Sequence, residues 1–196
     1  MRQFPGRIAG YCFLNPGYGR EALQELDRCV AGAGMVGVKF YNQYKIDDPV
    51  TFPVIERSIE MGVPILVHAG RLVDPVDLVQ QPRTSHAEDV VRVGRRYPEA
   101  MFIEGHIGGG GDWEWTLKVL RDAPPNIFLD TSGSVIDAGM IERCVRDLGE
   151  ERLLFATDMT MEGGVAKILD AGLGEAQRER IFWRNFQGLL DRRRVG

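Results

Sequence analysis

The sequence has few cysteines, few histidines and no long apolar run, and each of these shortages narrows its class. Only three of the 196 residues are cysteines, Cys12, Cys29 and Cys144, and their wide spacing matches neither a disulfide framework nor a structural zinc motif. No apolar stretch approaches the roughly 20 residues that a membrane helix needs, and the first residues lack the apolar centre of a signal peptide. We therefore expect a soluble cytoplasmic protein without a membrane partner.

A basic surface is also missing. The formal net charge is -4, and the densest basic cluster, residues 192–194, stands at the C-terminal end. Nucleic-acid binding usually requires a basic patch on the folded domain, so we expect no nucleic-acid partner and interpret the cluster as a solvated tail. With 44% hydrophobic residues, the chain can bury one substantial core, and we expect residues 1–196 to form a single domain.

Six short apolar runs alternate with amphipathic stretches. The runs are predicted as strands at residues 7–14, 35–41, 64–68, 101–106, 126–130 and 152–158. Helices are predicted at residues 19–32, 49–61, 85–97, 112–122, 137–147, 161–171 and 175–191, and Ser85 with Glu88 is typical of a capping box. This alternation indicates a parallel α/β sheet. A barrel is favoured over an open doubly wound sheet, because the first turn, NPGYGRE, lacks a phosphate-binding glycine pattern.

Ionisable residues stand at the ends of five predicted strands: Lys39 with Tyr41, His68, Glu104 with His106, Asp130, and Asp158. The C-terminal ends of parallel strands form one rim, and the alternation of side chains predicts that this set faces the barrel interior. Charges buried there need ion pairs or a metal as compensation, and histidine with aspartate is a zinc-type ligand set. These donors therefore predict a divalent metal, of the zinc type, held by His68, His106 and Asp158.

Structural roles remain as alternatives for several of these residues. Lys39 and Glu104 can form a buried ion pair. Asp130 can anchor its own loop by accepting backbone N–H bonds. His86, the third histidine of the chain, fits a helix cap better than a metal site.

Four residues are predicted to bind the substrate. Arg71 lies in the long loop at residues 70–84, which we interpret as an active-site flap, and its planar fork suits a substrate carboxylate. Lys39 and Tyr41 end a strand at the predicted rim. Trp113 and Trp115 are two residues apart on a predicted helix, so they cannot both face the core, and we take Trp113 as the one at the pocket mouth.

Several segments of the chain resemble one known family. In order along the chain they are GVKFY, PILVHAG, RRYPEAMFIEGHIGG, NIFLDTSG and LLFATDM. The sequence is similar, over residues 7–190, to the amidohydrolase-related metal-dependent hydrolases, a branch that includes aminocarboxymuconate semialdehyde decarboxylase. The resemblance implies a distorted (β/α)8 barrel with a metal, commonly zinc, at its C-terminal rim. It also implies His68 as the fifth-strand ligand, His106 as the sixth-strand ligand or general base, and Asp158 as the eighth-strand aspartate that binds metal and handles the proton of a water.

The chain departs from this family at its beginning. The family opens with a His-x-His pair on its first strand, and here no histidine precedes His68. The six runs correspond to strands three to eight, so we expect an incomplete barrel of about six βα units with weakened metal binding. Its two exposed edges, at residues 7–14 and 152–158, predict a homo-oligomer that covers them.

Two classes of function follow. The first is an enzyme, a metal-dependent hydrolase or a related decarboxylase or lactonase, that acts on a small carboxylated or cyclic molecule through metal-activated water. The alternative is a catalytically impaired barrel that serves as a binding or assembly module, which the missing His-x-His favours. A metal-independent lactonase, with Lys39, Arg71 and the histidines binding an anionic ring, is a weaker third option.

Overall fold

The structure, a computed structural model, describes residues 3–4, 6–107, 111–158 and 160–194. Its strands form one six-stranded sheet in which each strand runs parallel to its neighbours and the spatial order follows the chain order. The strands are Tyr11–Phe13 (β1), Gly37–Phe40 (β2), Ile65–His68 (β3), Phe102–Gly105 (β4), Ile127–Asp130 (β5) and Leu153–Leu154 (β6). Each lies within one of the six predicted runs.

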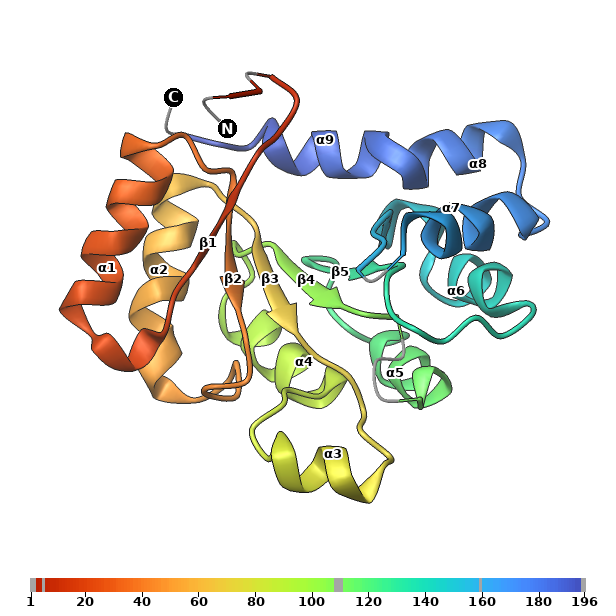
Figure 1. Cartoon of the computed structure of the whole chain (residues 1–196), viewed down its shortest axis with the longest axis horizontal. Helices are drawn as coiled ribbons and strands as arrows, with labels where there is room; N and C mark the ends of the chain where they lie inside the picture. Colours follow the sequence, from red (N-terminus) through yellow and green to blue (C-terminus); the bar gives the residue numbers. More distant parts are fainter. Residues whose placement is uncertain (1–2, 5, 108–110, 159, 195–196) are drawn as a thin grey trace.

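Helices connect the strands and follow the last one (Figure 1). The α-helices are Arg20–Asp27 (α1), Phe52–Met61 (α2), Pro75–Gln80 (α3), Ala87–Arg96 (α4), Trp113–Leu120 (α5), Met140–Leu148 (α6), Met161–Asp170 (α7), Glu175–Glu179 (α8) and Asn185–Leu190 (α9). Shorter 3-10 turns span Pro16–Tyr18, Pro49–Thr51 and Glu150–Arg152, and π turns span Arg28–Gly32 and Arg180–Arg184. The predicted flap contains α3, a short helix that sequence periodicity did not indicate.

The main core lies between the sheet and the helices that connect its strands. Residues of α1, α2, α4, α5 and α6 pack there against one face of the strands. Leu26, Ile55 and Leu120 are among its fully buried side chains. Burying a side chain of this size contributes about 1.5–3 kcal/mol, so this layer carries most of the apolar stabilisation.

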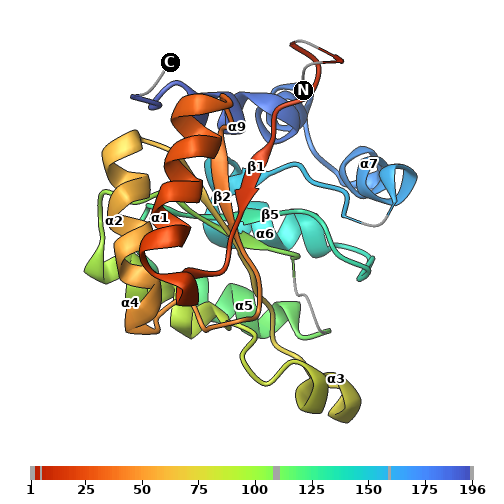
Figure 2. The same ribbon diagram turned by 60° about the vertical axis from the view of Figure 1, so that its left-hand side comes forward.

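The opposite face of the sheet carries a smaller core under α9. Leu189 of α9, with Phe186 beside it, packs against Ile103, Phe128 and Leu154 of the strands. Figure 1 shows α8 and α9 at one end of the strands and α3 projecting from the other end, and Figure 2 shows the same projection of α3 from a second angle. We call this opposite face of the sheet the inner face. It is covered by α8 and α9 at one end and accessible at the end where the strands terminate.

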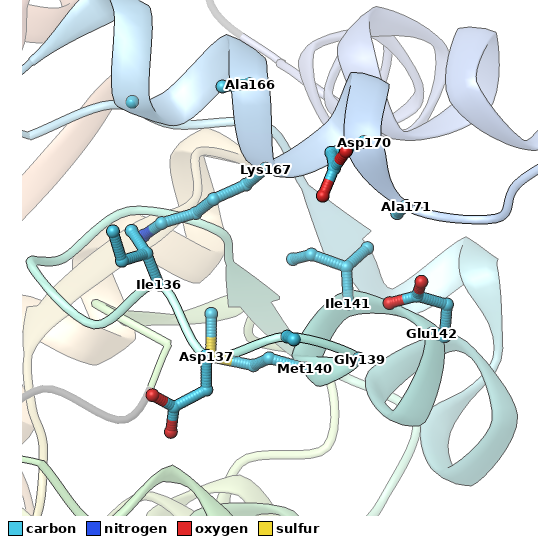
Figure 3. A pocket seen from close by; sticks show the side chains of 12 residues that line it. Ile136, Asp137, Gly139, Met140, Ile141, Glu142, Ala166, Lys167, Asp170 and Ala171 are labelled. Carbon is cyan, nitrogen blue, oxygen red and sulfur yellow. The ribbon is translucent and has the colours of Figure 1, made fainter.

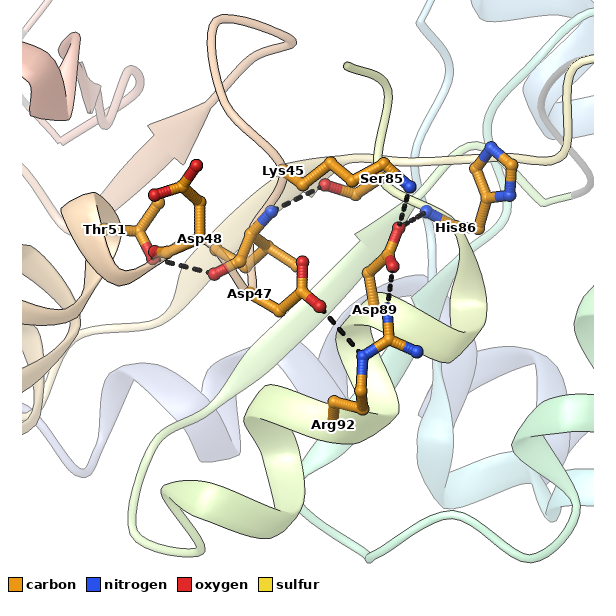
Figure 4. Close-up of polar contacts among 9 residues, drawn as sticks. Lys45, Asp47, Asp48, Thr51, Ser85, His86, Asp89 and Arg92 are labelled. Carbon is orange, nitrogen blue, oxygen red and sulfur yellow. Dashed lines mark hydrogen bonds and ion pairs between the residues drawn. The ribbon is translucent and has the colours of Figure 1, made fainter. Parts of the chain in front are cut away.

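Helix α4 begins one residue later than the capping box predicts. Ser85 does not cap the helix, because its hydroxyl accepts from the backbone N–H of Ile46 at 2.9 Å. His86 is the N-cap residue, and its backbone N–H donates to the carboxylate of Asp89 at 2.8 Å (Figure 4). The carboxylate that accepts from the N-cap backbone is thus that of Asp89 rather than Glu88. His86 is at the helix cap, as we expected.

The sheet ends at β1 on one side and β6 on the other, which are the two edges expected from the sequence. Association of copies across these edges stays a prediction. The three cysteines are free and buried. Among the residues that the structure describes, no helix is both long enough and apolar enough to cross a bilayer.

Glu104 faces the main core rather than the barrel interior, which corrects the expectation drawn from strand ends. On β4, Phe102 packs in the main core and Ile103 in the smaller core, so alternation places Glu104 on the side of Phe102. Its side chain is 1% exposed, and neither carboxylate oxygen has a hydrogen-bond partner within the described ranges. The alternative of an ion pair with Lys39 is therefore wrong as well, since Lys39 lies on the other face.

Burial, assisted by the nearby carboxylates of Glu88 and Asp130, raises the pKa of Glu104 to about 8. Asp89 acts in the same direction and the Arg152 guanidinium opposes it. At neutral pH the folded chain therefore holds Glu104 protonated, because an ionised carboxylate without a partner would be costly in this core.

The raised pKa predicts a stability that falls as the pH increases. Between about pH 4.5 and 8 the unfolded chain loses this proton while the folded chain keeps it, so the free energy of unfolding should decrease by at most about 1.4 kcal/mol per pH unit. Glu104→Gln should flatten the profile and unfold at a higher urea concentration at pH 8. Glu99→Gln, at an exposed position, is the control, and equal slopes for both variants would contradict this account.

Candidate active site

The strand-end histidines meet in a cavity at the terminating ends of the strands. The cavity has a volume of about 390 Å³, and it is lined by His68, His106 and Asp158 together with residues of the flap and of the loop after β5. The flap contributes Leu72, Asp77, Gln81 and Thr84, and the loop after β5 contributes Gly133, Ser134 and Val135. The parallel sheet thus brings together three residues of which the first and the last, His68 and Asp158, are 90 positions apart in the sequence.

His68 ends β3 and points to the inner face. Its ring lies against the ring of Tyr41, with centroids 4.1 Å apart, and edge-on to the ring of His106 at 4.6 Å. Burial, together with the neighbouring His106 and Lys39, lowers the pKa of His68 to about 4. The imidazole is therefore neutral at pH 7, the form in which histidine binds metals.

His106 and Asp158 face each other across the cavity. His106 Nε2 lies 3.8 Å from Asp158 Oδ2, and the side chains are 14% and 41% exposed. His106 Nδ1 lies 3.4 Å from the carbonyl oxygen of Ala69, which can only accept, so Nδ1 carries the proton of a neutral ring. Nε2 is then an acceptor turned toward a carboxylate oxygen. A proton or a cation between the two atoms would satisfy both.

Both residues have an unusual backbone conformation. His106 has φ 65° and Asp158 has φ 56°, and they are the two non-glycine residues with positive φ among those described. Side chains other than glycine occupy this left-handed region at a cost of about 1–2 kcal/mol. Because the chain leaves the extended conformation here, His106 does not follow Glu104 to the helix-covered face, and its ring turns into the cavity.

Asp130 anchors the backbone around His106. Its Oδ1 accepts from His106 N at 2.9 Å, from Ser132 N at 3.0 Å and from Ser132 Oγ at 2.6 Å. The side chain is 6% exposed. These contacts are those of the loop-anchoring alternative for Asp130, and they also hold the left-handed residue that follows β4.

Lys39 and Tyr41 lie at the inner face, but neither is among the residues that line the cavity. Val38 and Phe40 pack in the main core, so alternation turns Lys39 to the opposite side. Burial lowers the pKa of Lys39, although the carboxylates of Asp130 and Asp158 partly oppose this shift. Tyr41 is 40% exposed beside His68. Their roles toward a substrate stay predictions.

Arg71 and Trp113 do not line the cavity, which corrects their predicted placement. The Arg71 guanidinium stacks over the ring of Trp115 at 4.1 Å and pairs with Asp112 at 3.4 Å. Trp113 is 7% exposed in the main core, and its Nε1 donates to Asp137 at 2.7 Å. It falls on the buried face of α5 with Leu117 and Leu120, whereas Trp115 lies outside that face.

Sequence patterns missed two polar residues beside the site. Gln81 follows α3, and its Oε1 lies 3.4 Å from His68 Nε2. Lys167 of α7 donates to the carbonyl oxygens of Gly133 at 2.6 Å and Thr131 at 3.4 Å, which holds the loop after β5. A flap position could have suggested Gln81, but no local signal distinguishes Lys167 from a surface lysine of a helix.

A larger cavity of about 490 Å³ lies apart from the histidines (Figure 3). It is formed by residues 136–142 and one side of α7, with Lys167, Asp170 and Glu142 among its lining. Glu142 is already engaged, since it accepts from the backbone N–H of Gly172 at 3.1 Å. None of the strand-end residues lines this cavity, so its size does not make it the reactive site.

The donor set of the cavity fits a divalent metal only in part. Two ligands of one ion, each about 2.1 Å from it, lie at most about 4.2 Å apart, and the 3.8 Å between His106 Nε2 and Asp158 Oδ2 is within this span. Across the described ranges, however, no three His, Cys, Asp or Glu side chains are grouped so that they could hold a metal ion. The donor types and one pair fit a metal, whereas His68, which contacts Gln81, does not complete the set.

Comparisons with known proteins agree with this architecture. The γ-resorcylate decarboxylase of Polaromonas sp. (strain JS666 / ATCC BAA-500) is 24% identical over 233 residues, which cover 95% of this chain and 71% of that protein. A dihydroxybenzoic acid decarboxylase from Polaromonas sp. JS666, solved with manganese and 2-nitroresorcinol, superposes with a TM-score of 0.71 and 21% identity over 97% of this chain and 71% of that one.

A third relative has the same fold. The 5-carboxyvanillate decarboxylase from Sphingomonas paucimobilis gives a TM-score of 0.74 at 20% identity, over 97% of this chain and 68% of that one. The fold prediction is confirmed: the chain has a TIM-barrel-like α/β fold that is incomplete, with six strands of the barrel wall. The amidohydrolase family model matches residues 1–190, and the chain therefore belongs to the amidohydrolase family.

Proposed function

We propose that this chain is a metal-dependent decarboxylase that acts on a small carboxylated molecule in the His68–His106–Asp158 cavity. One observation carries the proposal. His106 Nε2 and Asp158 Oδ2, two acceptor atoms, face each other at 3.8 Å from strained backbone positions that face the same cavity. Strain retained at two facing polar residues is typical of functional sites. The membership in an enzyme family and the decarboxylase names of its relatives support the same reaction class.

The residues that would hold a divalent metal are His106, Asp158 and His68. When bound, such an ion would polarise a substrate oxygen and lower the pKa of bound water. Manganese accompanies one relative, whereas the donor types alone favour zinc, so both metals are candidates.

The chain's own residues can deliver the proton that decarboxylation consumes. The reaction breaks a C–C bond, releases CO2 and replaces the carboxylate with a C–H bond. A nitrogen of His106 or an oxygen of Asp158 that holds no ion would carry this proton in the cavity where this carbon would bind. Lys39 would attract the substrate carboxylate, and the half-exposed ring of Tyr41 offers a flat surface for an unsaturated substrate. Hydrolysis would use the same pair in the opposite direction, to accept a proton from water.

A binding module without catalysis is the second candidate. It is favoured by the finding that the described residues contain no complete three-ligand metal group. Metal content therefore separates the two candidates: a decarboxylase requires a bound ion, whereas the binding module does not.

Metal removal tests the proposal directly. The purified chain would be treated with a chelator, restored with Mn²⁺ or Zn²⁺, and assayed for CO2 release from a panel of hydroxybenzoic acids. We expect CO2 release only after metal is restored. An equal rate without metal, or no turnover in any condition, would contradict the proposal. Cleavage of an ester or lactone panel without CO2 release would replace decarboxylation by hydrolysis.

Substitution by asparagine separates catalysis from stability at the strained positions. Asparagine tolerates the left-handed conformation but cannot exchange a proton, so His106→Asn and Asp158→Asn should each lower kcat at least about 100-fold. The free energy of unfolding should change by less than about 1 kcal/mol. His86→Asn is the matched control, because this third histidine caps α4 outside the cavity and asparagine is a good N-cap. Loss of activity in the control as well would contradict the assignment.

A further inference from the structure

Gln81 connects the flap to His68 through its side-chain oxygen. Oε1 accepts from Asn42 Nδ2 at 3.1 Å, lies 3.4 Å from His68 Nε2 and is 3.5 Å from the hydroxyl of Thr84. Of the two polar atoms of the Gln81 amide, only the oxygen can accept the bond that Asn42 Nδ2 donates. The atom next to His68 Nε2 is therefore an acceptor.

This contact determines which nitrogen of His68 carries the proton. An acceptor beside Nε2 is satisfied by an Nε2–H donor, and this tautomer leaves the lone pair of the neutral ring on Nδ1. Nδ1 is buried and has no hydrogen-bond partner among the residues described. In this tautomer the nitrogen beside Gln81 is protonated, and the nitrogen with the free lone pair is buried.

The flap that carries Gln81 is weakly held. No residue of α3 is buried, and Val76, Leu78 and Val79 expose 60%, 46% and 80% of their surface. A six-residue helix without a buried face contributes little to stability, so displacing it costs little. Figures 1 and 2 show it projecting away from the sheet.

We propose that Gln81 is a positioning residue that holds His68 in the Nε2–H tautomer, and that the flap must release this contact before His68 can bind a cation through Nε2. The inference rests on the proposed function for the identity of the cation site, but the tautomer itself does not depend on it. It explains why His106 and Asp158 lie within the span of one ion while His68 is not part of a three-ligand group.

Nitrogen NMR of the three histidines tests the tautomer. The long-range ¹H–¹⁵N spectrum of the ¹⁵N-labelled chain, assigned with His86→Asn and His106→Asn, should show His68 protonated on Nε2. Gln81→Ala should shift this ring toward the Nδ1–H form, and Asn42→Ala should shift it in the same direction to a smaller extent. Gln80→Ala is the matched control, because it removes an identical exposed side chain one residue earlier. A protonated Nδ1 in the unaltered chain, or no shift in either variant, would overturn the inference.

Cation binding gives a second readout. Titration of Mn²⁺ into metal-free protein should show about fivefold tighter binding for Gln81→Ala than for the unaltered chain, because one side-chain hydrogen bond no longer has to be broken. Gln80→Ala should bind as the unaltered chain does. If Gln81→Ala binds more weakly or equally, the positioning role is contradicted. If no form binds Mn²⁺ or Zn²⁺, the proposed metal-dependent reaction fails, and the NMR comparison still decides the role of Gln81.

Discussion

The carboxylate of Asp130 is the interaction on which the rest of the site depends. A single oxygen accepts from the backbone of His106 and from both the backbone and the hydroxyl of Ser132. These bonds join the end of β5 to the residue that follows β4, and they stabilise a left-handed conformation that a histidine would otherwise avoid. Without this anchor, His106 would continue the alternation of its strand toward the helices, and the cavity would lose the partner of Asp158.

The close approach of β3 and β4 imposes a second constraint. A Cβ atom at Gly105 would lie 2.8 Å from the carbonyl oxygen of Val67, so only glycine fits immediately before His106. The glycine before His106 therefore serves the packing of the two strands, and this packing depends on the register of neighbouring strands.

Charge at the site is arranged so that one imidazole is neutral while anionic and cationic groups surround it. His68 is neutral because it is buried beside His106 and Lys39, and Lys39 itself is affected by Asp130 and Asp158. Glu104, on the other face of the same sheet, is a separate buried group whose pKa depends on the main core. The two faces of the sheet therefore carry ionisable groups in different surroundings. The inner one belongs to the proposed chemistry, and the outer one affects stability.

The sequence by itself determined the strand–helix alternation, the ends of the strands and the types of residue found there, because apolar periodicity and turn chemistry are local. It also gave loop anchoring as one of two roles for Asp130, because the bonds to Ser132 involve chain neighbours, whereas the bond to His106 depends on the fold. Tertiary structure decided what local patterns cannot encode. Alternation failed at His106, where the backbone leaves the extended conformation, and the partners of Arg71 and Trp113 come from α5 and the loop after β5. Gln81 meets Asn42 across 39 residues, and only the folded flap brings them together.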